Sequence, residues 1–261
     1  GDIMLSIRIF SLLKCFMAVV CLGGIACRRA PAGEVLGVEY PPVVFYAMGD
    51  VPYTPEEDGI LPGQIAALPE DGRFMIHVGD IKGGGTPCDE EVYVKVASML
   101  AKSKLPAFIV PGDNEWNDCT NPDQAWEFWT NHFTRFDLKW KHGLQVERQK
   151  NRDENFSFVE EGVLFVGINL VGGRFHDPAE WKNRLHDDIR WVETRIGLVQ
   201  EDIHCIVLMG HATPTPNHDE FFNPLVTLME KVKQPLLYLH GDGHRWIHDQ
   251  PFGTPWITRV Q

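Results

Sequence analysis

Basic residues are scarce in this chain of 261 residues: 24 Lys and Arg stand against 36 Asp and Glu, which gives a formal net charge of −12. So acidic a protein offers no basic stripe for phosphate contacts, which excludes a generic polyanion binder and argues against tight binding of nucleic acid. No CxxC spacing indicates a zinc knuckle. With 44% hydrophobic residues, the chain can nevertheless bury a sizeable core.

The apolar run of residues 15–27 is short for a membrane span, which needs about 20 residues. It follows Arg8 and Lys14 and ends in small residues, as a secretory signal peptide does. We therefore expect a leader over residues 1–27, a linker over 28–40 and an exported protein, whether periplasmic, lipid-anchored or extracellular. Residues 22–27 also resemble a bacterial lipobox, in which a lipidated Cys27 attaches the protein to a membrane. A buried N-terminal helix or an uncleaved anchor is the alternative.

Two of the remaining cysteines, Cys88 and Cys119, lie in polar loops that follow neighbouring predicted strands. In an oxidising compartment they can form a disulfide, and two reduced thiols are the alternative. Cys205 lies inside an apolar run and is expected to be a buried core residue.

From residue 41 onward, short apolar runs alternate with helical patterns, which predicts one α/β domain with largely parallel central strands over residues 41–261. The predicted strands are 43–48, 74–78, 106–110, 203–209 and 235–239, and the predicted helices are 60–68, 89–102, 122–133, 177–199 and 218–232. A hairpin is predicted from two apolar segments, residues 155–159 and 163–170. The sequence ends inside an apparent strand, so a complete domain and one truncated at its C-terminus are both open.

Each of these parallel runs is followed by glycine and a polar residue, at the edge where open α/β sheets bind ligands. The residues so placed are Asp50, Asp80, Asp113, His211, Asp242 and His244. Four carboxylates cannot all ionise close together without compensation. Two divalent cations would neutralise them, and the mixed oxygen and imidazole ligands favour Mn, Zn or Fe.

These residues fall in five short motifs: Gly49-Asp50, Gly79-Asp80, Gly112-Asp113-Asn114-Glu115, Gly210-His211 and Gly241-Asp242-Gly243-His244. Their order and spacing resemble those of the calcineurin-like metallophosphoesterases, over residues 50–244. The resemblance implies a β-sandwich flanked by helices, in four layers (α/β/β/α). It assigns Asp50 and His244 to a first metal, His211 to a second, and Asp80 to a bridge between the two. Residues 112–116, Gly-Asp-Asn-Glu-Trp, match a third motif found in a bacterial subgroup of that family.

Four positions depart from the family pattern. Pro52 replaces a histidine ligand, so the first metal loses a ligand unless Tyr53 or water substitutes. Asp113 and Asp242 replace an asparagine and a histidine, and both remain oxygen donors. Asn114 replaces the catalytic histidine; it can hold a phosphate oxygen but has no proton to give at neutral pH.

These residues predict a phosphoric ester hydrolase that acts on a small phosphorylated substrate. In this prediction the metals activate a hydroxide near Asp80, which attacks phosphorus, and Asn114 orients a phosphoryl oxygen. Esters with good leaving groups would suffer least from the missing proton donor. His240 is a candidate substrate-binding residue, and either His240 or His77 is a candidate replacement for the proton donor; a core or rim position without such a role is the alternative for both. Glu115 is expected to orient a neighbouring ligand. The competing hypothesis is a non-catalytic descendant that binds metal and a phosphorylated or glycan partner.

Two cations, Lys82 and Arg174, are candidates for contacts with phosphate oxygens. A solvated surface role is the alternative for both.

Overall fold

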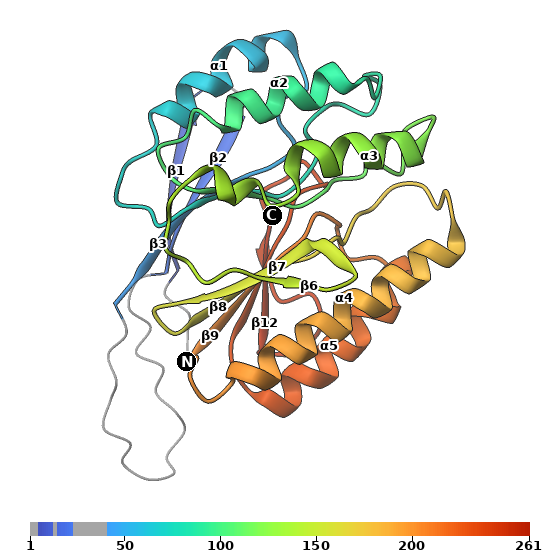
Figure 1. The fold of residues 1–261 in the computed structure, drawn as a ribbon. Coiled ribbons are helices and arrows are strands. Elements are labelled where there is room, and N and C mark those ends of the chain that lie inside the picture. Colours follow the sequence, from blue (N-terminus) through green and yellow to red (C-terminus); the bar gives the residue numbers. More distant parts are fainter. Residues whose placement is uncertain (1–4, 13–14, 23–40) are drawn as a thin grey trace.

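The computed structural model describes residues 5–12, 15–22 and 41–261. Two β-sheets lie face to face, and helices cover the outer face of each (Figure 1). The first sheet has the strand order β1-β2-β3-β4-β5, and the second has the order β11-β12-β10-β9-β8-β7-β6. The predicted four-layer α/β/β/α fold is confirmed.

The first sheet contains β1 (Leu5–Leu12), β2 (Cys15–Leu22), β3 (Val43–Met48), β4 (Met75–His77) and β5 (Ala107–Ile109). The second contains β6 (Glu147–Gln149), β7 (Arg152–Glu160), β8 (Val163–Gly167), β9 (Cys205–Met209), β10 (Leu236–Leu239), β11 (His248–Asp249) and β12 (Ile257–Val260). The α-helices are α1 (Pro55–Ala66), α2 (Glu90–Leu100), α3 (Pro122–Phe133), α4 (Pro178–Val199) and α5 (Asp219–Val232).

Phenylalanine side chains fill the space between the two sheets. Phe74, just before β4, lies with its ring centroid 5.1 Å from that of Phe45, 5.2 Å from that of Phe158 and 5.0 Å from that of Phe165. All four side chains are buried, and each contributes about 1.5–3 kcal/mol through burial. This aromatic packing fixes how the two sheets face each other and therefore how their edges align.

Helices α1, α2 and α3 pack on the outer face of the first sheet, and α4 and α5 pack on the outer face of the second. Helix α1 begins at Pro55, five residues before the predicted start, because Thr54 and Glu57 form a capping box that stabilises an earlier first turn. The other four helices begin and end within about two residues of the predicted bounds.

The central strands of both sheets are parallel. Strands β3, β4 and β5 pair in parallel, as do β8, β9, β10 and β12. The predicted hairpin is confirmed as β7 and β8, which turn through Glu161 and Gly162, both at positive φ. The carboxyl ends of the parallel strands therefore meet at one edge of the sandwich.

Strands β1 and β2 lie within the predicted leader, and β2 pairs antiparallel with β3. Cys27 and residues 28–40 fall outside the described residues, so the leader, the linker and the lipid anchor stay predictions. Among the described residues, no helix combines the length and the apolar character that crossing a membrane requires.

The predicted disulfide between Cys88 and Cys119 is confirmed, with a Cα–Cα distance of 6.0 Å. Cys205 is buried between the sheets, as expected.

Candidate metal centre

The loops at the carboxyl edge carry an unusual number of residues with a left-handed backbone. Asp50, Asp80, Asp242 and His244 have φ values of 55°, 60°, 76° and 52°. Such conformations are costly for residues other than glycine and gather at functional sites. Gly112 shows how closely the loops approach one another, since a Cβ atom there would lie 2.1 Å from the backbone nitrogen of Asp80.

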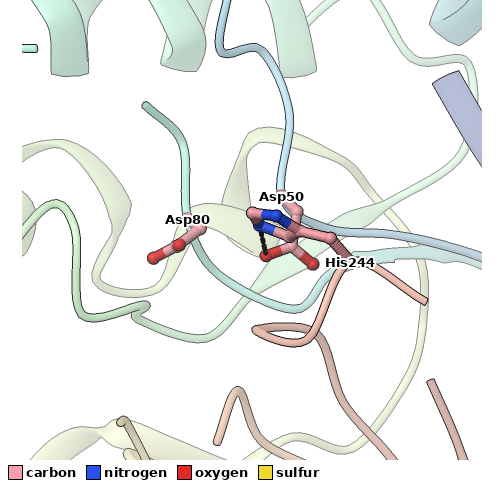
Figure 2. Close-up of side chains that lie close together, drawn as sticks. All are labelled: Asp50, Asp80 and His244. Carbon is pink, nitrogen blue, oxygen red and sulfur yellow. Dashed lines mark ion pairs between the residues drawn. The ribbon is translucent and has the colours of Figure 1, made fainter. Parts of the chain in front are cut away.

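Asp50, Asp80 and His244 form a first cluster (Figure 2), in which one ligand atom from each lies within 4.8 Å of the others. They come from the ends of β3, β4 and β10. His244 Nε2 is 3.4 Å from Asp50 Oδ1, and the His244 side chain is 58% exposed. The first cluster is therefore open to solvent on its histidine side.

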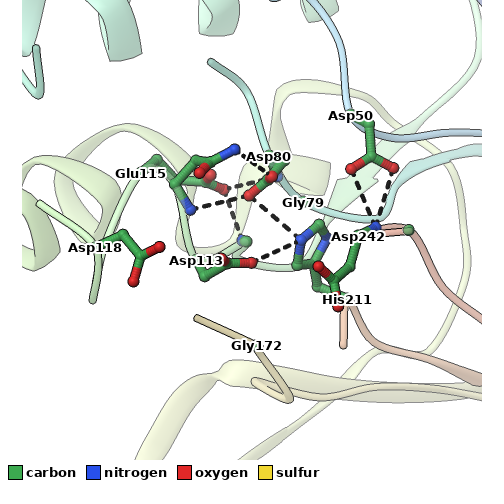
Figure 3. Close-up of polar contacts among 12 residues, drawn as sticks. Asp50, Gly79, Asp80, Asp113, Glu115, Asp118, Gly172, His211 and Asp242 are labelled. Carbon is green, nitrogen blue, oxygen red and sulfur yellow. Dashed lines mark hydrogen bonds and ion pairs between the residues drawn. The ribbon is translucent and has the colours of Figure 1, made fainter. Parts of the chain in front are cut away.

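Asp80, Asp113 and His211 form a second cluster that shares Asp80 with the first and has all three residues buried. His211 Nε2 lies 3.3 Å from Asp80 Oδ1 and 3.0 Å from Asp113 Oδ1 (Figure 3). The other ring nitrogen, Nδ1, is 2.8 Å from the carbonyl oxygen of Val78. That contact directs Nε2 at the two carboxylates, as a backbone carbonyl commonly does for a metal-binding histidine.

The second cluster has the donor atoms that a cation requires. His211 Nε2 and Asp113 Oδ1 are buried, and neither has a hydrogen-bond partner among the described residues although they lie 3.0 Å apart. Burial alone would lower the pKa of His211, but the negative charges of Asp80 and Asp113 raise it well above its usual value. A positive charge is thus favoured here, and a divalent ion can supply it in place of a proton.

Asp80 keeps its charge despite its burial. Burial would raise its pKa, but His211 and hydrogen bonds from Asn114 and Tyr53 lower the pKa to about 2. Its two carboxylate oxygens face different clusters, since Oδ1 lies near His211 and Oδ2 accepts a hydrogen bond of 2.7 Å from the Tyr53 hydroxyl. This position allows Asp80 to contact two ions at once.

Glu115 joins the loops that carry the two clusters. Its carboxylate accepts hydrogen bonds from the backbone nitrogens of Gly112 (2.7 Å), Asp80 (3.2 Å) and Ile81 (3.3 Å). Figure 3 shows Glu115 beside Asp80. Burial and then the charge of Asp80 raise the pKa of Glu115 to about 8. The side chain holds the backbone of Asp80 in place and does not join either cluster.

Asn114 and Tyr53 lie beside Asp80. The Asn114 amide donates to Asp80 Oδ2, and its backbone nitrogen donates to Asp80 Oδ1 at 3.0 Å. The Tyr53 hydroxyl is 3.1 Å from Asp50 Oδ1 and 3.2 Å from His244 Nε2, as well as being bonded to Asp80. Tyr53 therefore places an oxygen among all three residues of the first cluster.

Asp242 belongs to neither cluster. Its backbone nitrogen donates to both Asp50 oxygens, and its Oδ2 accepts a hydrogen bond of 2.8 Å from the backbone nitrogen of Thr213. Among the residues described, the carboxylate thus lies beside the centre and engages the chain after β9. Its assignment as a ligand stays a prediction.

The two candidate proton donors are buried and neutral. His240 stacks on Tyr238, its Nδ1 lies 2.8 Å from the carbonyl of Gly241, and burial lowers its pKa to about 3. Burial lowers the pKa of His77 to about 4, and its Nε2 lies 2.8 Å from the carbonyl of Val51. Neither ring carries the extra proton of an imidazolium at neutral pH.

Both cations considered for phosphate contacts bind backbone carbonyls. The Arg174 guanidinium donates to the carbonyls of Asn117 and Cys119, and the buried Lys82 ammonium donates to that of Gly83. Sequence reasoning also missed Asp118, which lies beside Asp113 across Gly173, where a Cβ atom would be 2.5 Å from Asp118 Oδ1 and 2.6 Å from Asp113 Oδ2. The only sequence signal for Asp118 was its position in the same loop as Asp113.

Comparison with known families decides the assignment. The family model for calcineurin-like phosphoesterase matches residues 58–246. The chain belongs to the calcineurin-like phosphoesterase family. Members of this family are in general metal-dependent hydrolases of phosphoesters, and both clusters described above have the Asp and His residues that bind divalent ions.

Two solved structures resemble this calcineurin-like chain. GAP50, the anchor in the inner membrane complex of Plasmodium, aligns with a TM-score of 0.51 at 10% sequence identity, covering 83% of this chain and 70% of that one, and it agrees with the fold. The protein TT1561 of Thermus thermophilus aligns with a TM-score of 0.43 at 13% identity, covering 82% of this chain and 87% of that one. No curated protein matches the chain.

Proposed function

We propose that this calcineurin-like chain hydrolyses phosphoric esters with two divalent metal ions, Mn, Zn or Fe. Asp50, Asp80 and His244 would hold the first ion, and Asp80, Asp113 and His211 the second. The observation that carries the proposal is the sharing of Asp80 between two clusters at one edge of the sandwich. Two adjacent ions lower the pKa of water and offset negative charge on the phosphoryl group.

Tyr53 supports the first site in this proposal. Its hydroxyl lies within hydrogen-bond distance of Asp50, Asp80 and His244, where it replaces the oxygen or nitrogen that Pro52 does not supply. Asp242 fixes Asp50 through its backbone nitrogen and adds negative charge beside the centre.

Asn114 has the role of orienting the substrate. Its amide nitrogen already donates to Asp80 and can donate to a non-bridging phosphoryl oxygen. Hydrolysis forms a bond from the water oxygen to phosphorus and breaks the bond from phosphorus to the ester oxygen. Because Asn114 has no proton to give, the leaving group takes its proton from solvent, and esters with acidic leaving groups react fastest.

We further propose a small phosphorylated substrate and an exported protein. The net charge of −12 opposes binding of nucleic acid. The disulfide between Cys88 and Cys119 supports an oxidising compartment outside the cytosol. Membrane attachment through a lipidated Cys27 remains part of this proposal.

The test is turnover of 4-nitrophenyl phosphate and bis(4-nitrophenyl) phosphate with added Mn²⁺ or Zn²⁺. Asp80→Asn keeps the shape of the side chain but removes the charge from both clusters, and we expect a loss of at least about 100-fold in rate. Asp123→Asn, in the first turn of α3, is the control and leaves the rate unchanged.

A second candidate function follows from Asn114, which lacks the proton of the family's catalytic histidine. In this case the chain binds two ions and a phosphorylated or glycan partner without turnover. Metal content near two ions per chain, together with no hydrolysis of either ester, would select this function over the first.

A further inference from the structure

A hollow of about 320 Å³ opens beside the first cluster, within the range of about 300–1,000 Å³ typical of ligand pockets. Its floor is mainly apolar, because Ala47, Val78, Leu239 and Val260 all belong to the core between the two sheets, while the buried His240 and the side chain of Gln261 add polar atoms to the lining. The hollow thus extends the edge of the sandwich inward, between the ends of β3, β10 and β12.

One wall of the hollow is made by the candidate metal centre. Asp50, Tyr53 and His244 line it, while the described residues of the buried second cluster do not (Figure 2 draws Asp50 and His244). A group bound in the hollow therefore lies next to the first ion and on the solvent-exposed side of the centre.

Arg245 and Trp246 line the hollow directly after His244, and Trp246 is 45% exposed. Within the described part of the chain, Arg245 makes no hydrogen bond or ion pair, in contrast with Lys82 and Arg174, which donate to carbonyls. Glu57, the remaining carboxylate in the lining, already accepts hydrogen bonds from backbone nitrogens at the start of α1. A cation without a partner and an exposed indole are thus available to a ligand.

We propose that this hollow binds the organic group of the substrate and that the group is an aromatic ring. Trp246 contacts the ring, and Arg245 binds the phosphoryl oxygens beside the first cluster. The inference rests on the proposed hydrolase function and names its substrate class: aryl phosphoesters. A ring can be buried against the apolar floor at no cost in polar hydration. An alkyl chain that carries charged or hydroxyl groups would lose the hydration of those groups there.

The chemistry of the centre favours the same class on separate grounds. Asn114 gives no proton to the departing oxygen, so the leaving group must be stable as an anion, as a phenolate is. A ring in the hollow thus serves both binding and departure. The hollow and Asn114 lie at different places in the centre, and both favour aryl phosphoesters.

Binding can be measured without turnover. In the Mn²⁺-loaded protein, calorimetry compares phenylphosphonate with methylphosphonate, which have the same charged group and differ in the ring. Burying the ring should make phenylphosphonate bind roughly 10- to 100-fold more tightly. Trp246→Ala should remove most of this difference, whereas Leu198→Ala, an exposed apolar residue near the end of α4, should leave it unchanged.

Arg245→Gln separates the two contacts. It should weaken both phosphonates by the same factor, about tenfold, because the guanidinium contacts the group that they share. For turnover, Trp246→Ala should raise KM for phenyl phosphate and leave KM for methyl phosphate unchanged.

The outcomes distinguish the two proposals. Equal affinity for the two phosphonates, or a preference that Trp246→Ala does not change, overturns the aromatic site while metal-dependent hydrolysis can still hold. If neither phosphonate binds, the phosphoryl site itself is absent and both proposals fall. A ring preference that Trp246→Ala removes supports the aromatic site even if hydrolysis is not found.

Discussion

The two clusters share a carboxylate but differ in their surroundings. His211 in the second cluster is fully buried and held by a backbone carbonyl, whereas the His244 side chain in the first is 58% exposed. A buried, pre-oriented ligand set loses an ion slowly, and an open one exchanges ions and admits substrate. If the proposed ions bind, we expect the buried half of the centre to hold its ion more tightly and the exposed half to admit the ester.

The largest effect should come from His211→Asn in the second cluster, with His244→Asn in the first cluster as its comparison. His211→Asn should lower the rate by at least about 100-fold, because the second ion is lost together with its charge stabilisation. His244→Asn should lower the rate about tenfold, and excess Mn²⁺ should restore it, because solvent can complete an open coordination shell. Metal content after dialysis and rates at increasing Mn²⁺ measure both. Equal metal loss in the two variants would contradict the asymmetry.

The disulfide offers the next largest effect. Both sulfur atoms lie near the carbonyl oxygen of Asn114, at 3.7 Å for Cys88 and 3.5 Å for Cys119. Asn114 directly follows Asp113, which belongs to the second cluster. The double substitution Cys88→Ser and Cys119→Ser should lower the free energy of unfolding by about 2–4 kcal/mol. Urea unfolding measures the loss, and wild-type protein treated with a thiol reductant should show the same shift. An unchanged midpoint would show that the loop is held by other contacts.

The pH dependence should report the charge of the second cluster. In the metal-free protein the pKa of His211 lies well above its usual value of 6.5, so the charged ring stabilises the fold below about pH 6.5, and this stability is lost as the pH rises through the raised pKa. Glu115, with a pKa raised to about 8, acts in the same direction up to that pH. Ion binding requires neutral His211, so stabilisation by Mn²⁺ should grow with pH.

Melting temperatures with chelator and with Mn²⁺, taken between about pH 6 and 9, test this prediction. The gap between the two curves should widen toward alkaline pH. His211→Asn should make the chelator curve flatter, and a wild-type gap that is constant with pH would count against a proton on His211.

The smallest effect is expected for Tyr53→Phe, which removes one hydroxyl from the first cluster and keeps the ring. The affinity for the first ion should fall by about tenfold or less, since Asp50, Asp80 and His244 remain. Titration with Mn²⁺ measures the change. Tyr93→Phe, whose hydroxyl donates to the carbonyl of Glu115 at 2.6 Å, serves as a buried control that leaves the first cluster intact.

Much of the fold was predictable because its signals are local. Strand β3 and helix α3 match their predicted bounds, since glycine or proline flanks a continuous apolar run in one and Asn121 caps the other. Strands β6 and β11 were missed because each is short and polar, so neither has an apolar period.

The site was predictable only in part. The motif order placed Asp50, Asp80 and Asp113 at one edge, and the structure brings them together. The sequence also predicted Asp242 as a ligand; its Oδ2 accepts a hydrogen bond from the backbone nitrogen of Thr213, and its assignment stays a prediction. The hollow forms where the two sheets pack around side chains that lie far apart in the sequence. No local sequence pattern predicts how closely the sheets approach each other there.

The left-handed residues of the centre limit which replacements give interpretable results. Asp50, Asp80, Asp242 and His244 all occupy a conformation that Asn and Gly accept readily and that β-branched side chains resist, at a cost of about 1–3 kcal/mol. A conventional alanine scan would mix the loss of a ligand with backbone strain, whereas an asparagine scan separates them. Selection for folded protein from libraries randomised at these four codons should accordingly return few amino-acid types, even when metal binding is not selected.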